Sequence, residues 1–294
     1  MHKKLQRFIS DYQPIIEDKM NHLLAATNVS DTLKSSMAYS VNAGGKRIRP
    51  LLVLATLEDL GVQSDDAVTV ACAVELIHTY SLIHDDLPCM DDDDYRRGKL
   101  TNHKVYGESV AVLAGDALQT LAFEALATLQ DTSAEDALQL IQLLAKASGS
   151  AGMVGGQMLD IEGESKRLSL MELENVHVNK TGALLSFSIE AGAILAGLHQ
   201  QKTAKLKAFA WNIGLAFQIQ DDILDITSTT EALGKPVGSD ISSDKSTYPS
   251  LLGLDGAKER LAEHHRLAGE ALAFLEKDQP LLGLFADYIV DRQS

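Results

Sequence analysis

The sequence has few cysteines, no excess of positive charge and no secretory signal, and each absence excludes a class of protein. Cys72 and Cys89 form no CxxC pair and no disulfide framework, which fits a reducing cytoplasm. With a formal net charge of −15 and no basic stripe, the chain lacks the footprint that nucleic-acid binding requires. Its basic N-terminal segment contains no apolar core and no small-residue cleavage site, so it does not have the pattern of a secretory signal.

Long uninterrupted apolar runs are also scarce. The stretch 182–198, for example, is interrupted by Ser188 and Glu190 and falls short of a membrane span. We therefore expect a soluble, cytoplasmic protein that makes no stable insertion into a membrane.

Helical periodicity, in contrast, extends over most of the chain. A protein of 294 residues, of which 45% are hydrophobic, can bury a large core. Helices are expected over residues 3–27, 64–87, 134–148 and 206–226, and Pro14 is expected to interrupt the first. No convincing alternating strand, repeat or linker is visible. The sequence therefore predicts an all-α protein in which residues 1–294 form a single large helical bundle domain.

The densest group of charges lies in residues 78–98, HTYSLIHDDLPCMDDDDYRRG. Six aspartates fall within ten residues there, and Arg96 and Arg97 follow them. Neighbouring carboxylates repel one another by roughly 1 to 4 kcal/mol, so such a cluster is costly unless a cation lies in it. Clustered hard oxygen ligands suit Mg2+ better than Zn2+.

A second, smaller group of carboxylates, FQIQDDILD, occupies residues 217–225. Both groups begin with an Asp-Asp pair in apolar sequence, as expected for two walls of one cleft. Mg2+ usually keeps several waters and binds a few carboxylates together with substrate phosphates. The two aspartate clusters therefore predict a phosphorylated substrate.

Positive charge gathers in NAGGKRIRP, residues 42–50, where two glycines precede Lys46, Arg47 and Arg49. Glycines let the backbone approach an anion closely, and cations beside the start of a helix add to its partly positive end. Anion binding and a solvated basic turn are both consistent with this segment.

Single polar residues lie within otherwise apolar helices. His78 lies about two turns before Asp85 on the same helix face and is either a substrate contact or an ordinary core residue. Lys180, beside a break at Gly182, either extends towards solvent or brings positive charge into a cavity. Gln218 belongs to a polar stripe on an apolar helix.

Two further segments suit ligand binding. Small residues in the glycine-rich segment 149–163 would let helices or a ligand come close, and its Gln157 and Asp160 either share a helix face or serve as caps. The loop after the second aspartate cluster contains Lys235 and Lys245, and loops of this kind often act as lids over phosphates.

These motifs together resemble the trans-isoprenyl diphosphate synthases, and most closely the bacterial farnesyl type. The resemblance extends over nearly the whole chain, through GGKRIRP, LIHDDLPCMDDDDYRRG, LAGDALQTLAFE, GGQMLDIEG, NKTGALL, FQIQDDILD, GKPVGSD and ADYIVDRQS. It implies an isoprenoid synthase fold whose central cleft is lined by the two aspartate motifs, and a homodimer. The implied reaction is a Mg2+-dependent condensation of isopentenyl diphosphate with dimethylallyl and then geranyl diphosphate, which yields (E,E)-farnesyl diphosphate and pyrophosphate by ionisation, condensation and elimination.

The same resemblance assigns roles to individual residues. It implies three Mg2+ ions, for which Mn2+ is an alternative, with the metal-binding set Asp85, Asp86, Asp91 and Asp221. The positions that would hold the allylic diphosphate are Arg96, Lys180, Lys235 and Lys245. Those that would hold isopentenyl diphosphate are Lys46, Arg49, His78 and Arg97. Thr181, Gln218 and the backbone carbonyl of Lys180 are expected to stabilise the allylic cation.

Product length is expected to depend on Tyr80, with Ser81 beside it. Tyr80 precedes Asp85 by five residues, which is about 7.5 Å along a helix, so a growing chain would meet an aromatic floor early. The first motif, DDLPCMD, is also two residues longer than DDxxD, and both features resemble the bacterial farnesyl type. We therefore predict a C15 product. The chain departs from the family at its end, where Arg292 is the only basic residue available to close over isopentenyl diphosphate.

Three alternative functions are each disfavoured by a specific feature of the sequence. A geranylgeranyl diphosphate synthase would make a C20 product, which Tyr80 disfavours. A terpene cyclase binds one diphosphate and has no need of GGKRIRP and Arg97. A noncatalytic regulatory subunit or metal-binding protein has no reason to keep both aspartate motifs and the lysines.

Overall fold

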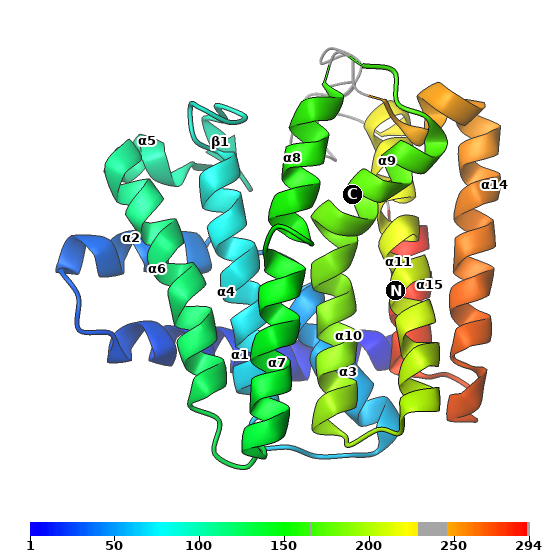
Figure 1. Ribbon diagram of the computed structural model, residues 1–294, viewed down its shortest axis with the longest axis horizontal. Helices are drawn as coiled ribbons and strands as arrows, with labels where there is room; N and C mark the ends of the chain where they lie inside the picture. Colours follow the sequence, from blue (N-terminus) through cyan, green and yellow to red (C-terminus); the bar gives the residue numbers. More distant parts are fainter. Residues whose placement is uncertain (165, 229–245, 293–294) are drawn as a thin grey trace.

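The structure is a computed structural model that describes residues 1–164, 166–228 and 246–292, and it is built almost entirely of helices (Figure 1). In chain order the α-helices are α1 (Lys3–Ala26), α2 (Asp31–Val41), α3 (Ile48–Leu60), α4 (Ala67–Asp85), α5 (Asn102–Tyr106), α6 (Glu108–Ala127), α7 (Ala134–Ser148), α8 (Met153–Gly163), α9 (Leu170–His177), α10 (Ala183–Leu195), α11 (Gln200–Thr227), α14 (Tyr248–Ala271) and α15 (Leu281–Asp291). The remaining elements are a π-helical turn η1 (Val178–Gly182), a 3-10 turn η2 (Ala273–Leu275) and the strands β1 (Tyr95–Arg96) and β2 (Lys99–Leu100). The all-α prediction is confirmed.

The long helices α4, α6, α7, α10, α11 and α14 stand roughly parallel to one another (Figure 1). At their centre, α4 packs against α1, α3, α6 and α10. Its sequence AVTVACAVELIHTYSLIHD is apolar nearly all round, and a helix of that kind is stable only when other helices surround it. The burial of α4 fixes the position of its C-terminal end, which carries the first aspartate motif.

Two described helices, α4 and α6, are long and apolar enough to cross a membrane by length and composition alone. Neither stretch was predicted from the sequence. In α4, 72% of the most apolar window is buried inside the bundle, as in the core helix of a globular domain, whereas the value for α6 is 44%. Part of the apolar surface of α6 therefore lies on the outside, at Val112 and Leu113.

Helix boundaries agree with the sequence in several places and differ in others. The predicted helix 134–148 is α7, with the same ends, and α4 ends before Pro88, as expected. Pro14 does not interrupt α1, because it lies on the exposed side, where the carbonyl of Ser10 can be hydrated. The hairpin of β1 and β2 was not predicted, since strands of two residues are too short to show alternation.

Candidate active site

The C-terminal half of α4 forms one wall of a cavity of about 420 Å3. α8 and η1 provide residues of the facing walls. The predicted site residues that line this cavity are Arg49, His78, Tyr80, Ser81, Asp85, Lys180 and Thr181. Most of its other lining residues are apolar: Leu82, Met90, Met153, Val154, Met158, Ile161 and Leu184. The cavity therefore joins a polar end at Asp85 to a largely apolar interior.

A second hollow, of about 430 Å3, lies along the polar stripe of α11. The predicted site residues that line it are Arg96, Lys180, Gln218 and Asp221, and Asp222 and Asp225 of the second motif line it as well. Lys180 lines both hollows. The first aspartate motif lines one hollow through Asp85 and the second motif lines the other, and we call the two hollows, which share Lys180, the composite cleft.

Lys180 and Thr181 owe their position to the π-helical turn η1, which corresponds to the break predicted near Gly182. A Cβ at Gly156 of α8 would lie 2.6 Å from the Asn179 carbonyl carbon, and one at Gly214 of α11 would lie 3.1 Å from the Gly182 Cα. Both glycines therefore allow their helices to approach η1 at backbone distance. The expectation that the segment 149–163 permits close approach is confirmed at Gly156.

The carboxylates of the first motif have different surroundings. The pKa of Asp85 is raised to about 6, chiefly by burial; Lys180 acts to lower it, and the nearby Asp91 and Asp86 act to raise it. The Asp91 N–H donates to the Asp85 carbonyl at 2.9 Å, which holds the two residues in one turn. Asp86 is buried, and its Oδ1 accepts a hydrogen bond from Arg96 Nε at 2.7 Å and lies 2.6 Å from Nη2 in an ion pair. Asp86 therefore contacts a cation of the chain itself.

These donors fit a hard divalent ion. Asp85 and Asp91 offer carboxylate oxygens, and a nearby cation would favour the charged form of Asp85 against the burial and the neighbouring carboxylates that raise its pKa. Within the described residues no group of three or more candidate ligands is already gathered. Mg2+ binds one or two carboxylates and takes its other ligands from water and substrate phosphates.

The residues predicted to hold isopentenyl diphosphate gather beside the first cavity. Burial beside Arg49, Arg97, Arg96 and Arg47 lowers the pKa of His78 well below its usual value, so its imidazole is neutral at pH 7 and donates through one N–H. Partial burial and Arg292 lower the pKa of Lys46, and Asp221 raises it. Lys46 is thus close to the second aspartate motif.

Arg97 reaches this group from the hairpin of β1 and β2. Its guanidinium donates to the Gly44 carbonyl and lies over Gly45, where a Cβ would be 2.6 Å from Nη1. Gly45 also has a φ of 127°, which side chains rarely tolerate. A glycine at this position therefore allows the loop and Arg97 to meet.

Several polar partners were not among the predicted site residues. Lys180 Nζ lies 2.7 Å from Asp160 Oδ2, a contact to which only the spacing of Gln157 and Asp160 pointed. His177 Nδ1 is 3.4 Å from Gln218 Nε2, and its ring stacks on Tyr248 with centroids 5.7 Å apart. No sequence signal identified His177. Lys235 and Lys245 lie outside the described residues.

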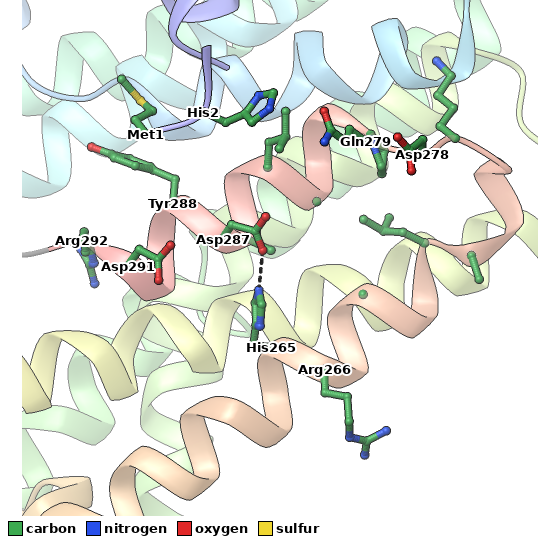
Figure 2. A pocket seen from close by; sticks show the side chains of 18 residues that line it. Met1, His2, His265, Arg266, Asp278, Gln279, Asp287, Tyr288, Asp291 and Arg292 are labelled. Atoms are coloured by element: carbon green, nitrogen blue, oxygen red, sulfur yellow. Dashed lines mark hydrogen bonds and ion pairs between the residues drawn. The ribbon is translucent and has the colours of Figure 1, made fainter. Parts of the chain in front are cut away.

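A separate hollow of about 740 Å3 lies between α14, α15 and the N-terminal residues (Figure 2). His265 Nε2 and Asp287 Oδ1 are 2.8 Å apart in its wall, and Arg292 lies at one end. The Arg292 guanidinium forms an ion pair with Asp221 in the second aspartate motif. The C-terminal arginine therefore belongs to the composite cleft.

Known proteins match this chain over most of its length. The polyprenyl synthetase family matches residues 30–273. The chain is 49% identical over 294 residues to farnesyl diphosphate synthase of Bacillus subtilis (strain 168), covering 99% of both chains, and 50% identical to chloroplastic geranylgeranyl pyrophosphate synthase of Catharanthus roseus, covering 92% of this chain and 77% of the plant protein. An apo crystal structure of an FPP/GFPP synthase from Zymomonas mobilis superposes with a TM-score of 0.88 at 39% identity, covering 99% of this chain and 100% of the other. The predicted resemblance is confirmed, and the chain belongs to the polyprenyl synthetase family.

Proposed function

We propose that the protein is a Mg2+-dependent prenyltransferase that condenses isopentenyl diphosphate with dimethylallyl and then geranyl diphosphate to give (E,E)-farnesyl diphosphate. One observation carries this proposal: an apolar cavity that contains Tyr80 adjoins a polar hollow that contains Asp221, and Lys180 lines both. An allylic diphosphate has the same division, with a hydrocarbon tail and an anionic head. The farnesyl diphosphate synthase of B. subtilis, at 49% identity, supports the same assignment.

The residues around the polar hollow suit the departure of pyrophosphate. Arg96 and Lys180 would hold the allylic diphosphate, together with Lys235 and Lys245. Asp85, Asp91 and Asp221 would hold Mg2+ directly, and Asp86 would act beside them by holding Arg96. When bound, Mg2+ supplies electrostatic stabilisation of the leaving pyrophosphate.

Ionisation of the allylic C–O bond leaves an allylic cation, which the double bond of isopentenyl diphosphate attacks before a proton is lost to pyrophosphate. The Thr181 hydroxyl, the Lys180 carbonyl and the Gln218 amide would face this cation with oxygen dipoles. The π-helical turn supports this role, because it carries both Lys180, which lines the two hollows, and Thr181, which lines the first. The apolar lining would keep water, which quenches the cation, away from it.

The second substrate would bind at Lys46, Arg49, His78 and Arg97. Arg49 and His78 line the first cavity. Arg97 donates a hydrogen bond to the Gly44 carbonyl in the adjoining loop. A neutral His78 can donate to a phosphate oxygen without adding charge. A terpene cyclase would have no use for this second anion site.

A C20 product is the nearest alternative, since geranylgeranyl synthases are also about half identical to the chain. Tyr80 favours C15. It is 5% exposed and its ring meets that of His84 edge-on, with centroids 5.6 Å apart. A ring packed in this way would limit the length of the hydrocarbon tail that the cavity can hold.

We also propose a cytoplasmic homodimer. The outer face of α6 exposes Leu113 by 57% and borders a groove of about 700 Å3 that Val29 and Leu33 also line. A second copy of the chain would bury this apolar surface. Both cysteines, buried Cys72 and exposed Cys89, are free thiols, which suits a reducing compartment.

The test is an incubation of the purified protein with dimethylallyl diphosphate, isopentenyl diphosphate and Mg2+, followed by mass analysis of the dephosphorylated products. A dominant C15 alcohol is expected, and omission of either substrate should abolish pyrophosphate release. A dominant C20 alcohol would favour the geranylgeranyl alternative. Pyrophosphate released from the allylic substrate alone would favour a cyclase, and no product would favour a noncatalytic protein.

A further inference from the structure

Arg47 is a buried arginine to which the proposed reaction assigns no role. It lies in the loop between α2 and α3, between the predicted substrate contacts Lys46 and Arg49, but its side chain is only 1% exposed. Its φ of 50° falls in the left-handed region, which is unusual for arginine. The side chain of Arg47 lies inside the protein, and its partners there indicate its role.

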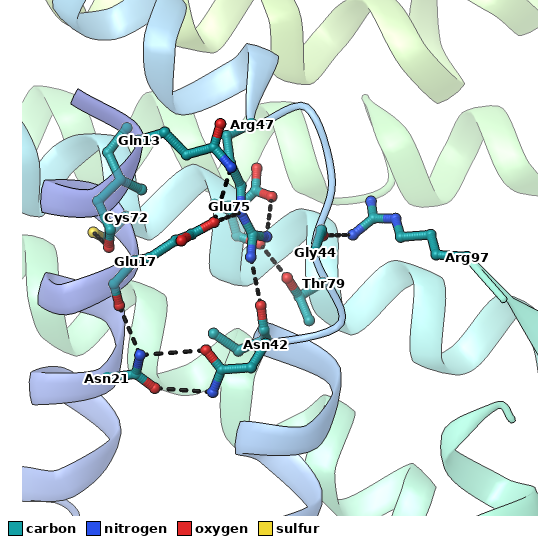
Figure 3. Close-up of polar contacts among 12 residues, drawn as sticks. Gln13, Glu17, Asn21, Asn42, Gly44, Arg47, Cys72, Glu75, Thr79 and Arg97 are labelled. Carbon is teal, nitrogen blue, oxygen red and sulfur yellow. Dashed lines mark hydrogen bonds and ion pairs between the residues drawn. The ribbon is translucent and has the colours of Figure 1, made fainter. Parts of the chain in front are cut away.

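Three elements meet at the Arg47 guanidinium (Figure 3). Nη1 donates to Glu75 Oε1 of α4 at 2.8 Å, and Nη2 donates to the Val41 carbonyl at the end of α2 at 2.6 Å. Nε lies 3.6 Å from Glu17 Oε1 of α1. The loop is thus held on its inner side by Arg47 and on its outer side by Arg97, which donates to the Gly44 carbonyl.

Glu75 is the reason that this arrangement matters for substrate binding. It is a buried carboxylate one turn before His78, and its charge raises the pKa of both Arg49 and Arg97 against the lowering effect of burial. Among the described residues, the ion pair that Glu75 makes is with Arg47. Its carboxylate therefore faces away from direct pairing with the arginines predicted to bind the second diphosphate.

Arg49 shows the consequence. Its Nε atom is buried without a hydrogen-bond partner, and it forms no ion pair with any residue in the ranges that the structure describes. A buried guanidinium donor without a partner is costly unless a ligand satisfies it. Arg49 is therefore prepared for an anion, provided that Glu75 stays bound to Arg47.

We propose that Arg47 is a positioning residue for isopentenyl diphosphate: by binding Glu75 it keeps this carboxylate from neutralising Arg49 and Arg97, and it fixes the loop that carries Lys46. The inference rests on the proposed function. In this arrangement one arginine of the GGKRIRP segment binds a carboxylate so that its neighbours can bind a diphosphate. Arg47 itself does not touch the substrate.

The test is a double-mutant cycle with separate Michaelis constants for the two substrates. Arg47→Met leaves Glu75 without its partner, and the KM for isopentenyl diphosphate is expected to rise at least about tenfold, as when one member of a buried charge pair is removed. The KM for geranyl diphosphate should stay within about twofold, because the partners of Arg47 include none of the described residues predicted to hold that substrate. Glu75→Gln added to Arg47→Met should restore most of the lost affinity.

Lys207→Met is the matched control, since it removes the cation that lies 2.8 Å from the half-buried Glu190 in another part of the bundle. It should leave both Michaelis constants unchanged. If Arg47→Met does not fold, Arg47→Lys, which keeps the charge but lacks the two-pronged group that bonds Glu75 and the Val41 carbonyl together, should raise only the KM for isopentenyl diphosphate. Calorimetric titration of each folded variant with isopentenyl diphosphate alone provides a readout that does not depend on turnover.

Three outcomes would overturn the inference. These are an unchanged KM for isopentenyl diphosphate in the Arg47 variants, an equal rise for both substrates, or a folded double variant that binds isopentenyl diphosphate as weakly as Arg47→Met. If the wild-type protein is active and binds isopentenyl diphosphate, each of these results rejects the role of Arg47 alone. A wild-type protein that forms no condensation product would instead reject the proposed function.

Discussion

Arg292 places its Nη2 atom 2.8 Å from Oδ1 of Asp221, so the end of the chain binds the first carboxylate of the second aspartate motif. The same guanidinium donates to the Phe217 carbonyl at 2.7 Å and stacks 3.9 Å above the Phe217 ring. Gln220 Nε2 donates a hydrogen bond to the Arg292 carbonyl at 2.9 Å. An arginine thus occupies the neighbourhood in which Asp221 is expected to bind a metal, and the two cations compete for one carboxylate.

Arg292→Met should therefore raise the affinity of the protein for Mn2+ in the absence of diphosphate. Loss of one charge-assisted hydrogen bond to Asp221 corresponds to a change of roughly tenfold. Titration of Mn2+ followed by electron paramagnetic resonance measures it. Arg266→Met, which removes an exposed arginine bonded to Glu270, should have no effect. Equal affinities in the wild type and Arg292→Met would show that the arginine does not compete.

Tyr80→Ala should lengthen the product to C20 and beyond. Removal of the ring opens the floor of the cavity that contains Asp85 at its polar end. Tyr80→Phe is the control and should still give C15, because the Tyr80 hydroxyl has no hydrogen-bond partner among the described residues. Mass analysis of dephosphorylated products distinguishes the two variants. A product that remains C15 in Tyr80→Ala would mean that the floor lies elsewhere.

His177 should make stability fall as the pH falls. Burial lowers its pKa to about 4, from the usual value of 6.5. Between these values the unfolded chain is protonated and the folded one is not, so the contribution is fully present above pH 6.5 and is lost towards pH 4. A shift of this size corresponds to about 3 kcal/mol in the free energy of unfolding.

Urea-unfolding midpoints at several pH values test this dependence. His177→Gln should unfold at lower urea concentration than the wild type at neutral pH, but its midpoint should fall less steeply below pH 6.5. His22→Gln is the control, since the His22 side chain is 72% exposed, and it should keep the wild-type slope. Parallel slopes for His177→Gln and the wild type would contradict the assignment.

Leu113→Glu should convert the proposed homodimer to a monomer. A charge on the outer face of α6 would be costly to bury against a second copy. Light scattering coupled to size exclusion measures the mass directly. Leu138→Glu on α7, at a leucine that is 54% exposed, should not change it. A wild-type monomer, or dissociation by both substitutions, would reject α6 as the interface.

Much of the fold and many of the site residues were predictable because their signals are local. The spacing of apolar residues over 134–148 sets a helix whose ends the structure reproduces. Asp85 and Tyr80 share one helix, so their separation follows from helical rise alone. The motifs around Lys180 and Gln218 likewise keep their spacing in any helix. Residues of this kind can be predicted without the tertiary structure.

Partnerships between distant residues were not predictable. Asp160 was one of several polar residues on α8 until the fold placed it 2.7 Å from Lys180. Arg47 had the same appearance in the sequence as Lys46 and Arg49, yet it is the one that turns inwards to Glu75. Each of these contacts depends on how helices pack, which periodicity does not specify.

The sequence by itself determined the helical class, the two carboxylate motifs and the family, because helix periodicity and motif spacing are properties of neighbouring residues. Only the tertiary structure decided which charges face the cleft and which are bound by the protein's own groups. The physical reason is that charges a few ångströms apart interact by several kcal/mol in a partly buried setting. The distances between Asp86 and Arg96, Arg47 and Glu75, and Arg292 and Asp221 exist only after the bundle has closed.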